Sequence, residues 1–354
     1  MLRPMNVDSL DPPNVTLAEI AREAGVSPST VSRILNGSAR VAPDKQRAVE
    51  QAIARFNYRP NGLARSLASG KTDTIGVLTQ TISSPFYAEW MRGIEDALHE
   101  PGLTPMFVSS RWNVKDEIAR IEHFIERRVD GIIVLHAQLD EQVLDEYSRR
   151  VPIVALGRAL SSTATLAGLP VDNLQGARDA TQHLIDLGHR EIAFIAGPPN
   201  HSDAIERLVG YRMTLEEAGI DFDADRVEQA DFLEAGGLAA MERLFARGKS
   251  FSAVFCANDL SAYGARLSLF RHGLRVPEDI SLVGFDDLPS SSYMTPPLTT
   301  VRQPTYEIGR MAAEALMQLI HKETVILNPF PVTFVTRETT RRISLPAGEG
   351  VLPA

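Results

Sequence analysis

Residues 15–37, with the sequence VTLAEIAREAGVSPSTVSRILNG, decide how the chain begins its fold. Thr16 and Glu19 fit a capping box, in which the threonine hydroxyl accepts a backbone N–H and the glutamate reaches back, so a helix is expected to start at residue 17. Apolar residues then recur at helical spacing, and Gly25 supplies the left-handed residue that ends many helices. The stretch therefore opens with a short, capped helix.

A second helix is predicted to follow at once. Ser27 is placed as its N-cap, Pro28 as its first residue, and Asn36-Gly37 ends it after Leu35. Opposite its apolar stripe lie Pro28, Ser29, Ser32 and Arg33. Two short helices joined by a tight turn form a helix-turn-helix, and small polar groups with one arginine suit the major groove of DNA. The alternative is a capped helical hairpin in some other α-helical domain.

The next segments predict a third helix and then a break. Residues 43–56 supply apolar side chains that close a three-helix core, and residues 57–61 interrupt the pattern. Residues 61–71 are small and helical in pattern, but a helix of that length is marginal in water and needs a partner. We therefore predict a tail at 1–14, a DNA-binding domain at 15–60, and a hinge helix with its linker at 61–71.

The stretch at 15–37 and the stretch YRPNGLARSLASGKTDTIGVL at 58–78 together resemble the head of the lac repressor family, and the resemblance extends from about Val15 to Arg342. It implies that helix 28–35 reads the major groove of a palindromic operator, and that two hinge helices pair in the minor groove, where Leu67 wedges a base step open. The candidate DNA-binding residues are Thr16, Ser27, Pro28, Ser29, Thr30, Ser32, Arg33, Asn36, Tyr58, Asn61, Ala64, Leu67 and Ala68. Several relatives carry larger side chains at the positions of Pro28 and Ser29, which leaves the operator sequence open.

From Thr74 onward, short apolar runs alternate with helical patterns. The runs are Ile75–Thr79, Thr104–Ser109, Gly131–Leu135, Pro152–Leu156, Ile192–Ala196, Ala253–Cys256 and Ile280–Gly284. This βαβ rhythm predicts the α/β class, with parallel strands in two doubly wound halves. The resemblance implies two subdomains of periplasmic-binding-protein type in an effector-binding and dimerisation domain at 72–345. They cover about 72–172 with 303–333 and about 173–300 with 334–345, and residues 346–354 form a tail.

Open α/β sheets bind ligands at the carboxyl ends of their strands, so the residues that follow each run are candidates. The candidate effector-binding residues are Phe86, Tyr87, Arg158, Ser202, Asp203, Arg207, Phe232, Asn258 and Asp286. Charged and amide groups beside aromatic faces suit the hydroxyl pairs of a sugar or other polyol. The resemblance matches Arg207, Asn258 and Asp286 to sugar-contacting positions. The structural alternatives are an N-cap for Asn258, a turn cap for Asp286 and a core position for Phe232.

A purine or nucleoside is the second candidate effector. Phe86 and Tyr87 resemble the aromatic pair that sandwiches a purine in some relatives, whereas His201 stands where the purine-binding relatives carry an arginine. The resemblance therefore favours a sugar over a purine. The main prediction is a sequence-specific DNA-binding transcriptional regulator, expected to be a repressor, whose operator affinity is controlled by a sugar or sugar derivative bound between the two halves.

The charge of the chain is divided between its two ends. The whole chain has 36 Lys and Arg against 45 Asp and Glu, a formal net charge of −9, which by itself argues against a nucleic-acid partner. Residues 1–71, however, carry ten basic and six acidic side chains, a net of +4, and residues 72–354 carry −13. Because the basic segment coincides with the predicted helix-turn-helix, we expect DNA to bind there and to be repelled elsewhere.

Composition and motifs disfavour other classes of protein. The single cysteine, Cys256, excludes a disulfide framework and a cysteine-based zinc site, and the eight histidines lack metal-ligand spacing, so no metal or cofactor is expected. No GxSxG, Walker, Rossmann or HExxH motif indicates an enzyme, and a periplasmic solute-binding protein would need a signal peptide and no head. Without a long apolar run, we expect no membrane partner and a cytoplasmic, nucleoid-associated protein. The tail lacks leucine heptads, which predicts a homodimer.

Overall fold

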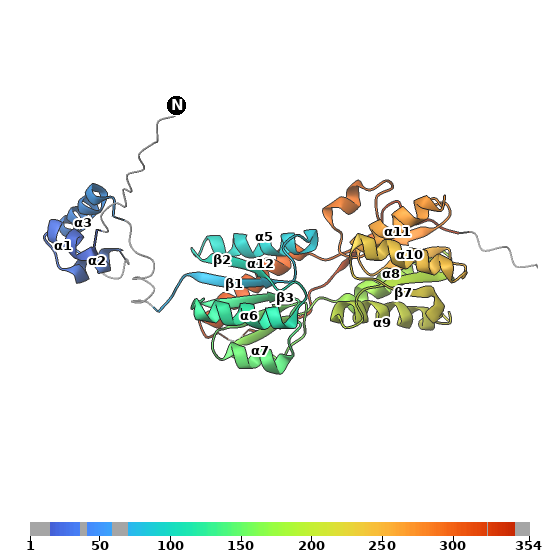
Figure 1. Ribbon diagram of the computed structural model, residues 1–354, viewed down its shortest axis with the longest axis horizontal. Coiled ribbons are helices and arrows are strands. Elements are labelled where there is room, and N and C mark those ends of the chain that lie inside the picture. Colours follow the sequence, from blue (N-terminus) through green and yellow to red (C-terminus); the bar gives the residue numbers. More distant parts are fainter. Residues whose placement is uncertain (1–14, 36–40, 59–69, 324, 344–354) are drawn as a thin grey trace, which may run out of the picture. The chain divides into compact units, whose positions relative to one another are not determined.

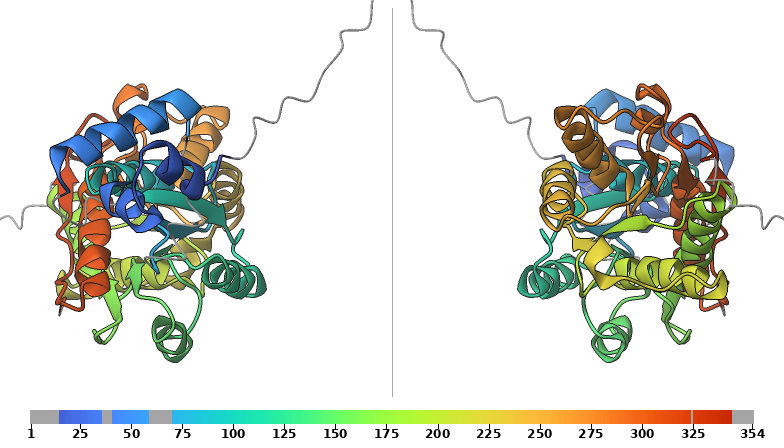
Figure 2. Two further views of the ribbon diagram at one scale, coloured as in Figure 1. Left: turned by 90° about the vertical axis from the view of Figure 1, so that its left-hand side faces the viewer. Right: turned by 90° about the vertical axis from the view of Figure 1, so that its right-hand side faces the viewer.

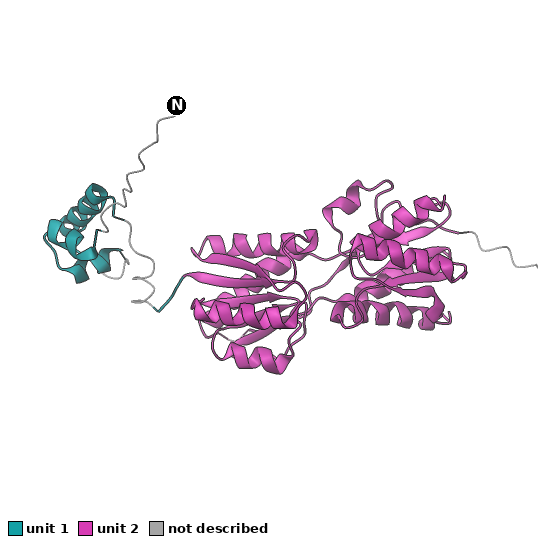
Figure 3. Cartoon of the chain, viewed as in Figure 1, with its two compact units in different colours: residues 1–72 teal, residues 73–354 magenta. Residues whose placement is uncertain are grey.

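The computed structural model describes residues 15–35, 41–58, 70–323 and 325–343 (Figure 1). The chain forms two compact units, residues 1–72 and residues 73–354, which we call the head and the body (Figure 3). The predicted tails at 1–14 and 346–354 lie outside the described residues, as do Asn36, Asn61, Ala64, Leu67 and Ala68. The DNA-binding roles assigned to these five residues remain predictions.

In its described residues, the head consists of α1 (Leu17–Glu23), α2 (Pro28–Leu35) and α3 (Pro43–Phe56). The predicted capping box is present, because the Thr16 backbone N–H donates to Glu19 Oε2 at 2.7 Å and the Glu19 N–H donates to Thr16 Oγ1 at 3.3 Å. Ile20, Val31 and Val49 are fully buried and pack the three helices together. The predicted helix-turn-helix is therefore confirmed.

The first lobe of the body is a parallel sheet with helices on both faces. Its strands are β1 (Thr74–Thr79), β2 (Thr104–Ser109), β3 (Gly131–Leu135), β4 (Ile153–Leu156) and β5 (Leu166–Leu169), in the order β2-β1-β3-β4-β5. Its helices are α5 (Pro85–His99) and α12 (Thr305–Ile320) on one face, and α6 (Val114–Glu126) and α7 (Glu141–Ser148) on the other. The strand order reverses between β1 and β3, which makes the lobe doubly wound.

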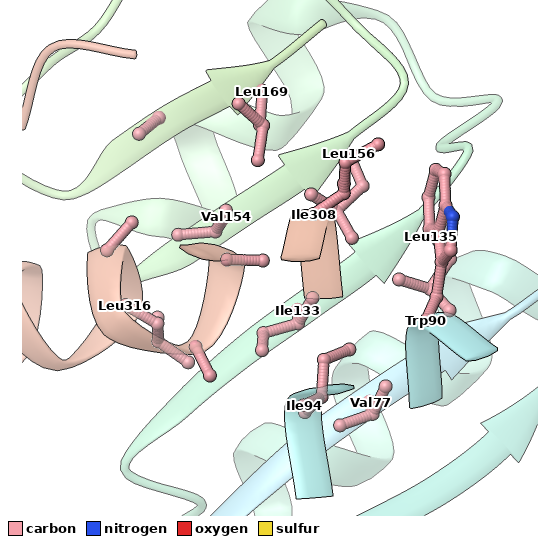
Figure 4. Close-up of a cluster of buried hydrophobic side chains, with 14 of the residues drawn as sticks. Val77, Trp90, Ile94, Ile133, Leu135, Val154, Leu156, Leu169, Ile308 and Leu316 are labelled. Atoms are coloured by element: carbon pink, nitrogen blue, oxygen red, sulfur yellow. The ribbon is translucent and has the colours of Figure 1, made fainter. Parts of the chain in front are cut away.

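Helix α12 returns to the first lobe from far along the chain and packs beside α5. Figure 4 shows Ile308 of α12 and Trp90 of α5 in the same cluster of buried side chains as Ile133 of β3. The two helices approach closely, because a Cβ at Gly93 would lie 2.1 Å from the carbonyl oxygen of Tyr306. The first lobe is thus built from two segments that are distant in sequence.

The second lobe repeats this architecture with a smaller sheet. Its strands are β6 (Ile192–Ala196), β7 (Val227–Gln229), β8 (Ala253–Cys256) and β9 (Ser281–Val283), in the order β7-β6-β8-β9. Its helices are α8 (Asn173–Asp186), α9 (Ser202–Glu217), α10 (Glu234–Ala246) and α11 (Asp259–Arg271), with short 3-10 turns η1 (Ala224–Arg226) and η2 (Pro289–Tyr293). An antiparallel pair, β10 (Thr300–Arg302) and β11 (Thr333–Val335), accompanies the segments that run to and from α12. The end-on views in Figure 2 show helices outside the strands.

The α/β class and the seven predicted strands are confirmed; four strands match the predicted bounds, and the ends of β1, β4 and β9 differ by one residue. Among the described residues, the prediction missed β5, β7, β10 and β11. Each of these has three or four residues, so alternation gives little signal; β4, β8 and β9 are as short but were predicted from apolar runs.

Candidate functional site

Six of the eight described residues that were predicted to bind DNA lie in α2 or directly before it. Ser27, Pro28, Ser29 and Arg33 are exposed, and Thr30 and Ser32 are half-buried. Ser27 caps the helix, since its hydroxyl oxygen accepts the Thr30 backbone N–H at 3.2 Å. Arg33 Nε donates to the Ser29 carbonyl at 3.2 Å, which holds the guanidinium along the same face. The helix therefore presents hydroxyl groups and one cation on a single exposed surface, a suitable set for the major groove.

Two further DNA-binding candidates support the fold of the head. The Thr16 side chain belongs to the capping box of α1, and its residue is exposed. Tyr58 is half-buried and packs against the core of the head. Thr16 therefore caps α1 and Tyr58 packs on the core of the head, in addition to any contact with DNA.

A cleft lies between the two lobes of the body, at the carboxyl ends of their strands. The first lobe contributes Thr81, Ser84, Phe86, Tyr87, Trp112 and His136. The second lobe contributes His201, Asp203, Arg207, Asp231, Phe232, Leu233, Asn258, Leu260 and Asp286. Aromatic rings thus face charged and amide groups across the cleft, as expected of a site that binds a polar ring-shaped ligand.

Arg207 is the most constrained group in the cleft. It is 3% exposed, its Nε donates to Asn173 Oδ1 at 2.9 Å, and its Nη1 donates to the Ala257 carbonyl at 2.6 Å. The guanidinium lies 3.8 Å from the centre of the Phe285 ring, a cation–π contact. Two backbone or amide anchors and a ring fix its position, so it is held ready to bind a ligand.

Two carboxyl groups flank this guanidinium, and their pKa values are shifted in opposite directions. Asp203 Oδ2 lies 3.6 Å from Nη2, and Asp286 Oδ1 lies 3.6 Å from Nη1. Burial raises the pKa of Asp203, but His136, His201 and Arg207 together outweigh it and hold that pKa below its ordinary value. Burial raises the pKa of Asp286 well above its ordinary value, although Arg207 opposes the shift. The environment of the cleft therefore favours the ionised form of Asp203 and opposes ionisation of Asp286.

His201 is a neutral base on the floor of the cleft. Burial lowers its pKa to about 4, and its Nδ1 accepts the backbone N–H of Asp203 at 3.2 Å. Its ring lies 5.2 Å, between centroids, from each of Trp112, His136 and Phe232. His201 is therefore an N-cap and a ring contact and not a second cation beside Arg207.

Several lining residues have an unusual backbone conformation. Trp112, His136, Phe232 and Asp286 have φ values of 60°, 54°, 67° and 115°. This left-handed region disfavours side chains with a Cβ and costs about 1–3 kcal/mol for each residue. The four residues follow β2, β3, β7 and β9, so the residues with strained backbone lie at the strand ends that border the cleft.

Known proteins resemble both units of the chain. Residues 16–61 match the family described as bacterial regulatory proteins, lacI family, and residues 181–340 match the periplasmic binding protein-like domain. The chain is 37% identical to catabolite control protein A of Priestia megaterium over 316 residues, which cover 88% of this chain and 94% of that protein. The chain belongs to the lacI family.

Two solved structures of lacI-family regulators agree with this fold. The complex of the transcriptional regulator CelR with cellobiose is 36% identical, with a TM-score of 0.70, and the match covers 92% of this chain and 99% of that one. The lac repressor dimer bound to operator and the anti-inducer ONPF is 31% identical, with a TM-score of 0.84 over the same shares. This lacI-family chain is therefore a DNA-binding transcriptional regulator with a helix-turn-helix head and a periplasmic-binding-protein-like body.

The structure brings most of the predicted effector-binding residues of this lacI-family chain together. Phe86, Tyr87, Asp203, Arg207, Phe232, Asn258 and Asp286 all line the cleft. The N-cap alternative for Asn258 also holds, because its Oδ1 accepts the Ser261 N–H at 3.0 Å while Nδ2 donates to the Phe232 carbonyl at 2.9 Å. Structural and ligand-binding roles are thus compatible at this position.

Two predicted residues lie outside the lining of the cleft. Arg158 turns back into its own lobe, where Nη1 donates to the carbonyls of Ala137, at 3.2 Å, and Leu139. Ser202 begins α9, and its hydroxyl donates to Asp203 Oδ1 at 3.3 Å. A position near the end of a strand is therefore not enough to predict that a residue lines the cleft, because the direction of its side chain decides what it contacts.

Trp112, His136 and His201 also line the cleft, although they are not among the nine candidate residues. The rule of strand ends points to His136, which follows β3, and could also have found Trp112, which follows β2. Among the described residues, no group of three or more histidine, cysteine or acidic side chains could hold a metal ion. In the same described part of the chain, no helix is both long enough and apolar enough to span a membrane.

Proposed function

We propose that this protein is a transcriptional repressor that binds a palindromic operator through α2, and that a sugar bound between the lobes controls its operator affinity. The observation that carries the proposal is Arg207, held between the carboxyl groups of Asp203 and Asp286 in a cleft with aromatic walls. Such a set donates to and accepts from neighbouring hydroxyl groups. The cellobiose bound by CelR, a relative at 36% identity, supports a sugar as ligand.

A purine is less well supported than a sugar. Recognition of a purine's oxygen and nitrogen edge favours an additional charged donor. By the family resemblance, His201 stands where the purine-binding relatives carry an arginine. Burial lowers the pKa of His201 to about 4, so this side chain is neutral at pH 7. We propose binding without catalysis, since the charged groups of the cleft pair with one another. Because DNA is the target, we place its action in the cytoplasm, on the nucleoid.

We infer that two chains pair through an apolar patch on the second lobe, formed by Leu267, Phe270 and Tyr293. These side chains are 43%, 73% and 86% exposed, and surfaces of this kind mark interfaces. The Tyr263 hydroxyl lies 2.7 Å from the Ser291 hydroxyl, so η2, which carries Tyr293, is bonded to α11, which carries Leu267 and Phe270. The lac repressor relative is a dimer on its operator, and a two-fold dimer matches a palindromic site.

The proposed function is tested with the full chain and an operator selected from a random duplex library. Neutral sugars, sugar phosphates and nucleobases are compared by thermal melting and by operator affinity. We expect at least one sugar to raise the melting temperature, because a ligand bound only by the folded state stabilises it. That sugar should change operator affinity by about fivefold or more, and the operator should change sugar affinity by the same factor.

Other outcomes of the same screen decide between the alternatives. A response to nucleobases alone would replace the sugar by a purine. If the affinity for the sugar were equal with and without operator, the proposed coupling would be wrong.

A second prediction concerns the DNA-reading face of α2. Arg33→Ala is expected to weaken binding to the selected operator by about 1–3 kcal/mol, because an arginine paired with guanine in the major groove contributes about that much. Fluorescence anisotropy at fixed salt measures the change. Arg22→Ala in α1, also exposed in the head, is the matched control and should have a smaller effect. An equal loss on operator and on random DNA would instead assign Arg33 to a phosphate contact.

A further inference from the structure

The two lobes touch directly across the floor of the cleft. His136, which follows β3 in the first lobe, has Nε2 2.9 Å from Oδ2 of Asp203, in the first turn of α9 in the second lobe. Each side chain is only 4% exposed. Because Asp203 is ionised, the imidazole N–H donates, and hydrogen bonds to a charged acceptor are among the stronger ones.

The first lobe fixes the His136 ring in this position. Its backbone has a φ of 54°, which a residue with a Cβ adopts at a cost, and its ring stacks on Trp90 with centroids 5.0 Å apart. Gly157, directly after β4, leaves the space that the ring fills, since a Cβ there would lie 2.4 Å from His136 Cδ2. A strained residue aimed at the opposite lobe points to a function for the contact.

The second lobe fixes the acceptor as firmly. Arg207 Nη2 lies 3.6 Å from the same Oδ2, and the Asp203 backbone N–H donates to His201. The His201 ring in turn contacts Trp112 and His136 of the first lobe. The contact between the lobes is therefore a buried cluster centred on one hydrogen bond.

Entry of a ligand requires this contact to break. The cleft has a volume of about 70 Å³, whereas sites for small ligands usually have about 300–1,000 Å³. A sugar ring can enter only when the lobes separate. We propose that the hydrogen bond from His136 Nε2 to Asp203 Oδ2 is an interlobe latch that sets the population of the open cleft, and thereby the rate of effector entry. The identity of that effector as a sugar rests on the function proposed above.

The test compares His136→Phe and Asp203→Asn with the wild type in the full chain, without sugar. Phe keeps a ring beside Trp90 but cannot donate, and Asn keeps the shape of Asp203 but removes its charge. The chain has two tryptophans, and both adjoin the latch: Trp90 stacks on His136 and Trp112 contacts His201. Trp112 is already 41% exposed whereas Trp90 is fully buried, so the part of acrylamide quenching that comes from Trp90, corrected for the excited-state lifetime, reports opening of the cleft.

We expect the open fraction to rise about tenfold in His136→Phe, the factor that a hydrogen bond to a charged group contributes, and less in Asp203→Asn. The matched control is His183→Phe, which removes a histidine contact of equal length, 2.9 Å to Thr340 Oγ1, within the second lobe. Its quenching should equal that of the wild type. Wild-type quenching in both latch variants, with circular dichroism showing them folded, would overturn the proposal. If His136→Phe fails to fold, Asp203→Asn decides alone.

A sugar found in the screen provides a second readout. Its association rate, measured by stopped flow, should rise about tenfold in His136→Phe, because the cleft spends more time open. An unchanged rate would contradict the latch even if quenching had increased. Failure of every sugar to bind counts against the proposed function alone, since the quenching experiment uses no ligand.

Discussion

Arg207→Met is expected to lower the free energy of unfolding of the body by about 3–5 kcal/mol and to abolish its response to sugar. Methionine fills similar space but leaves the two carboxyl groups of Asp203 and Asp286 buried without their shared cation. The Asn173 amide oxygen and the Ala257 carbonyl also lose their donor. Removing one partner from a buried charged network leaves the other charges unpaired, which costs more stability than replacing the whole network by apolar residues.

Urea unfolding followed by tryptophan fluorescence measures this loss, because both tryptophans belong to the body. The control is Arg212→Met on the same helix. The Arg212 side chain is 58% exposed and pairs with Glu216 one turn away, and exposed pairs contribute little. Equal losses in the two variants would show that Arg207 acts through the stability of α9 and not through the charges of the cleft.

A pair of variants is expected to change the pH dependence of stability in opposite directions. Burial lowers the pKa of His201 from 6.5 to about 4, so between these values the unfolded chain binds the proton and stability rises with pH. Burial raises the pKa of Asp259 from 3.8 to about 7, so between these values the folded chain binds the proton and stability falls as pH rises. In the wild type the two slopes oppose each other between about pH 4 and 6.5.

The variants His201→Gln and Asp259→Asn separate these contributions. At about 1.36 kcal/mol for each pH unit between the two pKa values, His201 contributes about 3 kcal/mol and Asp259 about 4 kcal/mol. Relative to the wild type, His201→Gln should lose stability as pH rises from 4 to 6.5, and Asp259→Asn should gain it as pH rises from 4 to 7. Urea midpoints across this range measure both differences, in which titrating groups that do not interact with the substituted residue largely cancel.

Parallel curves for either variant and the wild type would contradict the corresponding pKa shift. The Asp259 carboxyl lies within hydrogen-bond distance of the Leu288 N–H, the Ser291 hydroxyl and the Thr300 hydroxyl. The protonated acid and Asn each accept on one atom and donate from the other, so Asn is a close substitute in which the Thr300 hydroxyl accepts. Loss of one of these contacts would lower stability equally at every pH. Such a uniform loss is distinguishable from a change of slope.

The sequence was sufficient to predict the head and the strand ends of the body. Capping at Thr16 and the Ser27-Pro28 start are local signals, and the structure retains both. The residues of the cleft followed from one topological rule, which identified Arg207 and Asp286.

What the sequence could not predict depends on side-chain direction and long-range contact. His136 reaches Asp203 only because its own φ is positive and because Gly157, from the next strand, leaves space for its ring. Arg158 has the right place in the sequence, but its long side chain finds two carbonyl acceptors in its own lobe. Neither outcome is encoded in periodicity or spacing, because both depend on residues that pack together from separate strands.

The position of α12 has a consequence for the order in which the protein is completed on the ribosome. β5 ends at Leu169 and α12 begins at Thr305, so translation at about 5–20 residues per second separates them by roughly 7–27 s. During that interval the faces of Trp90 and Ile94 that α12 covers have no partner within the nascent chain. All four strands of the second lobe emerge in the meantime. The first lobe therefore stays incomplete while most of the second lobe is synthesised, and the second lobe is completed in turn by residues 334–343, which follow α12 and bond to β9 and α8.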